Sequence, residues 1–278
     1  MRAQPSGAVV VVTRPGEAGQ RLSCALRDRG QAALWWPAFE LLAPDELGPL
    51  HAVLRDLARF DLVVFVSAAA VRGLAGLDGC GQWPPGTAIA APGASTLQLA
   101  RSLLPGAAAA RSIGPAAETR QSGSEALWEA LREQATPPRL ALIVRAETGR
   151  EWLGDRLREA GCRVEYASVY RRVVHTPSAE QRAALGACRA AGRRAIALVT
   201  SSEAVAALDR QLGESPEAKA WLREGLALCP HPRIAQALRA AGYAEVIECE
   251  LSAAAVVDAI RNSRRGQAAP RTAEASPR

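Results

Sequence analysis

The sequence predicts an α/β protein with parallel sheets, because it contains an internal repeat and apolar runs that do not alternate. In the repeat, a valine and an arginine precede two leucines and a glycine, with the same arginine-to-glycine spacing in both copies (Val12, Arg14, Leu22, Leu26 and Gly30; Val144, Arg145, Leu153, Leu157 and Gly161). Each apolar run followed by leucines at helical spacing predicts a strand buried on both faces, a tight turn and a helix. Units of this kind assemble into parallel sheets.

The individual elements follow from the same two patterns. Apolar runs predict strands near residues 8–13, 32–36, 61–66, 87–91, 109–113, 139–144, 162–166, 195–200, 225–229 and 245–249. Helical spacing of apolar residues predicts helices near 17–29, 46–58, 68–76, 94–104, 122–134, 149–160, 178–190, 202–212, 231–241 and 252–263. Residues 84–86 and 136–138 are rich in proline and predict loops. Residues 266–278 lack apolar repeats and predict a disordered tail.

Polar residues stand where the predicted strands end. Residues 60–71 and 195–205 are matched apolar runs that end in hydroxyl side chains, and residues 90–96 match 228–234, again as strand, turn and helix. Ligands of open α/β sheets bind at the carboxyl ends of strands, where free N–H groups of helix N-termini attract anions. Gly93 in such a turn would let the backbone approach a ligand closely. The sequence therefore predicts two sets of anion sites.

These residues also have simpler explanations. Ser67, Ser201 and Ser202 stand at positions where serine commonly caps a helix. His231 is a candidate because histidine is a common general base, but no Ser, Cys or acid stands beside it at a catalytic spacing. A capping or surface role is thus the alternative to a general base at His231.

Composition favours a small anionic ligand over nucleic acid. The 278-residue chain has a net charge of +6, and Lys219 is the only lysine among its 34 basic residues. Arginine suits bidentate contacts with carboxylates and phosphates. Aromatic residues make up 4% of the chain, no basic run is interleaved with them, and the arginines are scattered among acids along predicted helices. That distribution is typical of solvated helix faces and argues against a nucleic-acid site.

The sequence carries no signal for a membrane, for export or for a metal. No uncharged apolar run approaches the ~18 residues of a membrane span, and residues 1–7 lack the order of a signal peptide. We therefore expect a cytoplasmic protein. The six cysteines form no CxxC motif and have no histidine partners at zinc spacing, so we expect reduced thiols and no metal site.

Several short motifs, taken in order, resemble the uroporphyrinogen-III synthase family. Each is chemically ordinary, so their order and spacing over residues 8–263 carry the resemblance. The motifs are Thr13-Arg14-Pro15, Phe65-Val66-Ser67-Ala68-Ala69-Ala70-Val71, Gly93-Ala94-Ser95-Thr96, Arg145-Ala146-Glu147 with Gly149-Arg150, Val169-Tyr170-Arg171 and Thr200-Ser201-Ser202. Where the family often has Thr-Ser-x-Asn-Ala-Val, Val66 and Ala69 replace a hydroxyl and an amide, so backbone N–H groups must supply any contact those side chains make in relatives.

The resemblance implies a fold that the repeats alone do not. Tandem repeats by themselves suggest domains at 1–135 and 136–265. The family pattern implies two similar three-layer domains with exchanged segments, in which 1–36 packs with 172–265 and 39–170 forms the other domain. A two-stranded β linker would join them, with a cleft between the domains.

The resemblance also implies the reaction. Hydroxymethylbilane, a linear tetrapyrrole, would close to uroporphyrinogen III with loss of water and inversion of ring D, without metal or organic cofactor. Cyclisation without inversion occurs unaided, so the protein would mainly fold its flexible substrate into the productive geometry. The eight carboxylates of that substrate match the predicted anion sites. We expect a monomer with no nucleic-acid or membrane partner, which contacts the preceding pathway enzyme at most transiently.

Site residues follow from the resemblance and from the strand ends together. Tyr170 is the candidate catalytic residue, because its phenol could hydrogen-bond the departing hydroxyl; the alternative is that its ring packs on Trp35 or Trp36. Arg14 and Arg145 either bind carboxylates or form salt bridges to Glu17 or Glu147. The candidate substrate-binding residues are Thr13, Arg14, Ser67, Ala68, Gly93, Thr96, Ser124, Arg145, Thr200, Ser201, Ser202, His231 and Arg233.

Three other functions compete with this interpretation. A two-domain binding protein for a small anion would use the same cleft, but would be expected to carry a signal peptide. A non-catalytic tetrapyrrole carrier would bind the bilane and release no type III product. A sugar-nucleotide enzyme would show a glycine-rich phosphate turn, which this sequence lacks.

Overall fold

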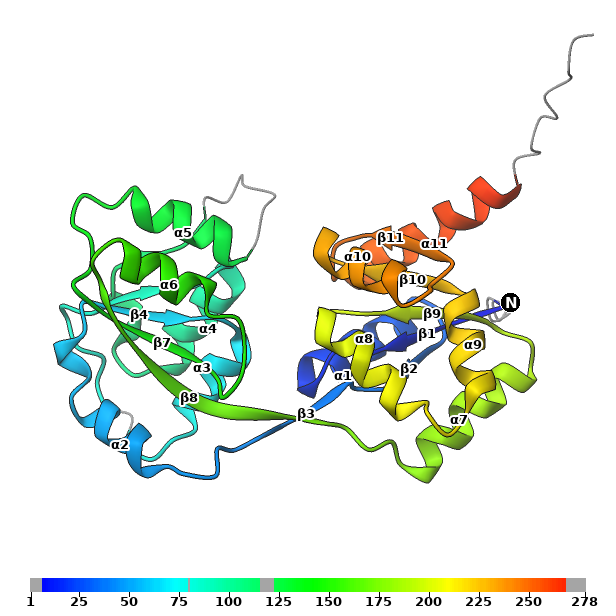
Figure 1. Ribbon diagram of the computed structural model, residues 1–278, viewed down its shortest axis with the longest axis horizontal. Coiled ribbons are helices and arrows are strands. Elements are labelled where there is room, and N and C mark those ends of the chain that lie inside the picture. The colour runs from blue at the N-terminus through cyan, green and yellow to red at the C-terminus, as the bar shows by residue number, and fades with distance from the viewer. Residues whose placement is uncertain (1–6, 80, 116–122, 269–278) are drawn as a thin grey trace, which may run out of the picture. The chain divides into compact units, whose positions relative to one another are not determined.

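The computed structural model describes residues 7–79, 81–115 and 123–268, and these form two compact units. Unit 1 contains the described residues up to Glu40 and from Val173 onward, and unit 2 is Leu41–Arg172. Each unit has its own sheet with helices on both faces (Figure 1). The prediction of an α/β protein with parallel sheets is confirmed.

Unit 1 is built on a five-stranded sheet in the order β11-β10-β9-β1-β2, whose recorded pairs are parallel. Its strands are β1 (Ala8–Val12), β2 (Ala33–Trp35), β9 (Arg194–Leu198), β10 (Leu226–Cys229) and β11 (Glu245–Glu248). Its helices are α1 (Gly16–Asp28), α7 (Ala179–Ala190), α8 (Ser202–Gln211), α9 (Pro216–Glu224), α10 (Pro232–Ala240) and α11 (Ala253–Ala268).

Successive residues of β1 point to opposite faces of this sheet and so enter two different cores. Val10 and Val12 pack with α1 and α11 on one face, whereas Val11 packs with α7, α8, α9 and α10 on the other. Every residue of β1 is buried, which explains why its sequence is an unbroken apolar run.

Unit 2 is built on a six-stranded sheet in the order β3-β8-β7-β4-β5-β6. Its strands are β3 (Phe39–Leu42), β4 (Leu62–Phe65), β5 (Ala88–Ala90), β6 (Ser112–Ile113), β7 (Leu140–Ala146) and β8 (Arg163–Val174). Its helices are α2 (Gly48–Arg55), α3 (Ala68–Ala75), α4 (Ala94–Leu103), α5 (Ser124–Arg132) and α6 (Trp152–Glu159), with 3₁₀ turns at Leu57–Arg59 and Ala107–Ala109. Val63 and Phe65 pack with α2, α3 and α4, whereas Leu62 and Val64 pack with α5 and α6.

The chain passes between the units in two neighbouring strands. It leaves unit 1 within β3 and returns to it within β8, because the boundaries fall at Glu40 and at Val173. β3 and β8 are hydrogen-bonded neighbours in the six-stranded sheet. Unit 2 is therefore a continuous segment inserted into unit 1.

Five elements differ from the sequence prediction, and one of them is β3, which was not predicted as a separate strand. The sequence analysis missed α9, which begins with Pro216 at its first helical position. β8 extends to Val174, well beyond the predicted 166, and β6 is shortened to two residues by the 3₁₀ turn before it. α11 continues to Ala268, three residues into the segment predicted to be a disordered tail, although glycine at 266 is a poor helix former. The remainder of that tail, 269–278, lies outside the described residues.

Candidate functional site

In unit 2, three helix N-termini follow neighbouring strands at the carboxyl edge of the sheet. β4, β5 and β6 are adjacent, and α3, α4 and α5 come directly after them. Ser67 caps α3, since its hydroxyl accepts a hydrogen bond from the Ala70 N–H at 3.1 Å. Gly93 is the N-cap of α4, and Ser124 is the first residue of α5. The free N–H groups of these first turns make the edge suitable for anions.

Tyr170 on β8 points toward the capped end of α3. Its phenol oxygen lies 3.3 Å from the Ser67 hydroxyl oxygen. Its ring is partly buried and packs on the core that contains α3 and α4. Trp35 and Trp36, the alternative packing partners of this ring, belong to the cores of unit 1, so that alternative stays a prediction. Two residues on the site list thus meet within hydrogen-bond range.

A bulge in β8 brings Tyr170 to that face. Arg145 pairs with Ser168, but Ala146, the next residue of β7, pairs with Tyr170, so Val169 is the extra residue. Val169 and Tyr170 consequently pack into the same core, although consecutive strand residues normally face opposite sides. Without the extra residue, Tyr170 would point to the other face of the sheet.

Arg145 is buried and holds a loop in place. Its residue exposure is 7%. Its Nε donates to the Ala146 carbonyl at 3.1 Å, and its Nη2 donates to the Gly149 carbonyl at 3.0 Å. Arg172 donates to the neighbouring Thr148 carbonyl at 3.3 Å. The loop after β7 is thus tied back to β7 and β8 by two guanidinium groups.

The remaining amino group of Arg145 is not open to solvent. Nη1 is buried without a hydrogen-bond partner among the described residues, and its ion pair is with Glu151 at 3.7 Å, not with the predicted Glu147. The guanidinium also lies over the ring of Tyr166, 4.8 Å from its centroid. A substrate carboxylate cannot reach Nη1 without displacing this loop, so we interpret Arg145 as a residue that positions the loop.

In unit 1, Thr13 serves the fold. Its side chain is fully buried, and its hydroxyl donates to the Leu198 carbonyl at 2.9 Å. Its own carbonyl accepts from the Ala38 N–H at 2.9 Å. The side chain of Thr13 is thus explained by its role in the fold, and its role as a direct ligand stays a prediction. Arg14 beside it is half-buried, and its carbonyl accepts from the Trp35 indole N–H at 2.9 Å.

The three hydroxyl-bearing residues after β9, which are Thr200, Ser201 and Ser202, have different roles. Ser201 caps α8 by accepting from the Ala204 N–H at 3.2 Å. Ser202 is the first residue of α8, and its buried hydroxyl has no hydrogen-bond partner in the described part of the chain. Thr200 is half-buried just before the cap. The capping explanation for Ser67 and Ser201 is therefore correct, and it does not exclude a ligand at the N–H groups beyond each cap.

His231 is a helix cap too. Its Nδ1 accepts from the Arg233 N–H at 3.1 Å at the start of α10, so this nitrogen carries no proton. Both residues are exposed. The next helix has an equivalent cap that the sequence analysis missed: the Ser252 hydroxyl accepts from the Ala255 N–H at 3.1 Å at the start of α11. The serine at the start of the predicted helix 252–263 was the available signal.

Two other candidates are less accessible or less specific than expected. Thr96 in the first turn of α4 is buried, with 8% exposure. Gly93 has an extended backbone and open space where a Cβ would stand, so it is not required there by its geometry. Ala68, the first residue of α3, offers only its backbone N–H.

The described residues show neither a metal-binding group of side chains nor a membrane-spanning helix. They contain no group of three or more His, Cys, Asp or Glu side chains placed to hold a metal ion, and none of their helices combines the length and apolarity that a membrane crossing needs. A cavity of about 450 Å³ in unit 2 is lined by Arg59, Leu140, Arg158 and residues 162–165. It lies where β7 and β8 begin, which is the opposite edge of the sheet from Ser67 and Tyr170.

Comparison with known proteins gives consistent results. A family model described as uroporphyrinogen-III synthase HemD matches residues 20–257. A uroporphyrinogen-III synthase of Salmonella typhimurium is 33% identical over 175 residues, which is 62% of this chain and 68% of that protein.

Two solved structures share the fold. A mutant uroporphyrinogen III synthase from the extremely thermophilic bacterium Thermus thermophilus matches with a TM-score of 0.58 and 18% identity, covering 93% of this chain and 99% of that one. The uroporphyrinogen-III synthetase of Helicobacter pylori matches with a TM-score of 0.54 and 16% identity, covering 92% and 99%. At these identities the structural likeness speaks for the fold alone.

Proposed function

Because this chain belongs to the uroporphyrinogen-III synthase family, whose members are cyclising lyases of heme biosynthesis, we propose that it converts hydroxymethylbilane to uroporphyrinogen III. The reaction closes the linear tetrapyrrole with loss of water and inversion of ring D. The match of the family model to residues 20–257 carries this proposal.

Substrate carboxylates bind at the helix N-termini of the two units in this proposal. In unit 2 these are the first turns of α3, α4 and α5, and in unit 1 those of α8 and α10. Backbone N–H groups supply most of the hydrogen bonds, because Ser67, Ser201 and His231 already use their side chains as caps. Binding shared among many N–H groups suits a flexible substrate with eight carboxylates, since the protein's main contribution is to fix its conformation.

Tyr170 is the proposed catalytic residue. Its phenol would donate a hydrogen bond to the departing hydroxyl group, which leaves as water when the carbon–oxygen bond breaks. The Ser67 hydroxyl, 3.3 Å from the phenol oxygen, would orient that proton. The pair sits beside the α3 N-terminus, so a carboxylate on the reacting ring would be held next to the leaving group.

The decisive experiment is incubation of the metal-stripped chain with enzymatically generated hydroxymethylbilane, followed by separation of the type I and type III isomers. The type I isomer forms unaided, so a large type III fraction is expected only if the chain catalyses the inversion. Type I product alone, or activity that returns only when metal is added, would contradict the proposal.

A non-catalytic tetrapyrrole carrier remains the second candidate, because the same N-termini would bind the bilane without turning it over. Slower formation of the type I isomer with no type III product would favour it. A two-domain binding protein for other small anions would bind acetate-substituted pyrroles no better than citrate.

We also propose that the chain works as a cytoplasmic monomer that meets the preceding pathway enzyme transiently. Sedimentation of the purified chain and fractionation of the source cells test these two points.

A further inference from the structure

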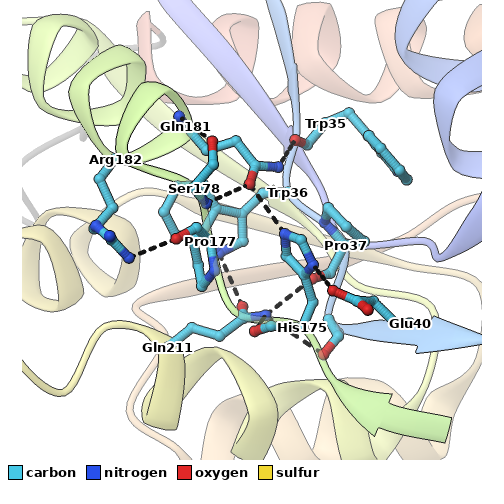
Figure 2. Close-up of polar contacts among 11 residues, drawn as sticks. Trp35, Trp36, Pro37, Glu40, His175, Pro177, Ser178, Gln181, Arg182 and Gln211 are labelled. Carbon is cyan, nitrogen blue, oxygen red and sulfur yellow. Dashed lines mark hydrogen bonds and ion pairs between the residues drawn. The ribbon is translucent and has the colours of Figure 1, made fainter.

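Both segments that connect unit 1 to unit 2 are tied to one cluster of side chains in unit 1. The cluster, which we call the linker anchor, consists of Glu40, His175, Gln181 and Gln211 (Figure 2). Glu40 lies in β3 and His175 follows β8 directly. The His175 N–H donates to the Ala38 carbonyl at 3.1 Å, so the outgoing and returning segments are also bonded to each other.

Gln211, the last residue of α8, uses its whole amide in the anchor. Its oxygen accepts from the Trp36 indole N–H at 2.8 Å. Its nitrogen donates to the Pro37 carbonyl and to the His175 carbonyl, each at 2.9 Å. One side chain therefore bridges the two segments and fixes both to α8.

The ring of His175 lies between two oxygen atoms. Its Nδ1 is 2.7 Å from Glu40 Oε1, and its Nε2 is 3.0 Å from Gln181 Oε1 (Figure 2). A carboxylate oxygen and an amide oxygen are both acceptors. A neutral imidazole has one N–H and can satisfy only one of them.

The Gln181 amide cannot turn round to relieve this. Its oxygen also accepts from the Ser178 N–H at 2.9 Å in the capping box of α7, and its nitrogen donates to the Trp35 carbonyl at 3.2 Å. A turned amide would place N–H against N–H at Ser178 and oxygen against oxygen at Trp35. These two hydrogen bonds thus fix the orientation of the amide.

We propose that His175 is a positioning residue whose doubly protonated ring locks both connecting segments to unit 1, and that the lock opens when the ring loses a proton. Glu40 holds the Nδ1 proton, because a bond to a carboxylate is the stronger of the two. Nε2 therefore loses its proton first. It then presents a lone pair to the Gln181 oxygen, and the contact becomes repulsive.

One acid and one cation are found near the ring of His175 in the described structure. Glu40 on β3 is the acid that faces it, with 48% side-chain exposure against 15% for His175. On α7, the cation near the linker anchor is Arg182, and its guanidinium donates to the Pro177 carbonyl (Figure 2). On α8 the facing group is the neutral Gln211. The Glu40 carboxylate is therefore the charged group bonded to the ring.

The link to turnover rests on the proposed function. If the chain must hold a flexible bilane in one geometry, a loosened anchor lowers the fraction of productive complexes. The protonation of the ring itself does not depend on that function, so the two parts can fail separately.

The first test is a two-bond ¹H–¹⁵N spectrum of the histidine rings in the whole chain at neutral pH. The chain has three histidines, and the variants His51→Gln and His231→Asn assign the signals. His175 should show two protonated ring nitrogens, whereas Nδ1 of His231 should be unprotonated because it accepts a hydrogen bond. An unprotonated nitrogen on His175 at neutral pH would overturn the proposal.

The second test uses two substitutions with opposite expected effects. Glu40→Gln removes the carboxylate, so the ring should lose its proton at lower pH than in the parent chain. Gln181→Glu keeps the capping oxygen and adds a carboxylate at Nε2, so the ring should stay charged to higher pH, although the variant also loses the hydrogen bond to the Trp35 carbonyl. In each chain the exchange protection of the His175 amide should fall roughly tenfold when the ring deprotonates, as expected for loss of one charge-assisted hydrogen bond.

The third test follows the pH profile of kcat/KM for type III product. Its alkaline decline should move down in Glu40→Gln and up in Gln181→Glu, with His51→Gln as the unchanged control. If all four profiles coincide, His175 has no positioning role in turnover. If the parent chain makes no type III product, the proposed function fails while the ring spectra still decide the state of the anchor.

Discussion

Replacing Tyr170 with phenylalanine separates the two roles that its position allows. The change removes the phenol oxygen and keeps the ring that packs on the core of α3 and α4. The lost contact is a long one, 3.3 Å to the Ser67 hydroxyl, and Ser67 retains its bond to the Ala70 N–H. We therefore expect a loss of unfolding free energy at or below about 1 kcal/mol, or a fall in Tm of roughly 2 to 4 °C.

The effect on catalysis should be larger than the effect on stability. Proton or hydrogen-bond assistance by a positioned side chain typically contributes about 10²- to 10⁴-fold. The hydroxyl of this substrate departs readily, so we expect an effect at or below the bottom of that range, a fall in kcat of about tenfold to a hundredfold. KM should change little, because backbone N–H groups of the helix N-termini, and not the phenol, hold the substrate carboxylates.

Two measurements carry this test: turnover to the type III isomer, and thermal unfolding of the same preparation. Tyr170→Ala serves as the packing control, because it removes the ring and should lower both Tm and rate. Ser67→Ala should cost about 1 kcal/mol of stability through its lost cap and reduce turnover only modestly. A phenylalanine variant with normal turnover would refute the catalytic role and leave the protein as a template that folds its substrate.

Three further predictions concern stability. Gly154→Ala should cost about 1 to 3 kcal/mol in urea unfolding, since its Cβ would lie 2.0 Å from the Tyr166 phenol oxygen; adding Tyr166→Phe should restore most of the loss, because that oxygen is buried without a partner in the described structure. Thr13→Val should lower the unfolding free energy by about 1 kcal/mol, because it removes the hydroxyl bond to the Leu198 carbonyl, which keeps its bond from the Thr13 N–H; KM should be unchanged, and a raised KM would return Thr13 to the ligands. Burial raises the pKa of Cys249 to about 11 and that of Tyr243 to about 12, so the fold favours the protonated forms. The contribution of these two groups to stability should be constant below about pH 9 and be lost between about pH 9 and 12, and an alkaline profile without such a fall would contradict this.

The strands could be predicted because a strand that is buried on both faces appears in the sequence as an unbroken apolar run. β1 and β4 lie in the middle of their sheets, with every residue buried, and both appear as unbroken apolar runs. β3 was not predicted as a separate strand, because it lies at the sheet edge and alternates buried and exposed residues over only four positions. α9, which begins with a proline, was not predicted as a helix.

The candidate site was predictable only in part. Ser67 and Tyr170 were both named from the sequence, but nothing there shows that they meet, because the meeting depends on the extra residue at Val169. A bulge leaves no compositional trace in a strand of mixed residues. Arg145 looked like a ligand by its position after a strand, yet its burial and its bonds to the following loop depend on packing between α6 and β8.

The insertion of unit 2 within unit 1 sets an order for folding during synthesis. The six strands of the unit 2 sheet have all been made once the chain reaches Val174. β1, although synthesised first, has β9 as a sheet neighbour, and that strand ends only at Leu198. β1 must therefore stay apolar and unpaired on that edge until β9 emerges from the ribosome, after all of unit 2 has been made. A chaperone that binds short apolar segments would meet its main target here, at Ala8–Val12.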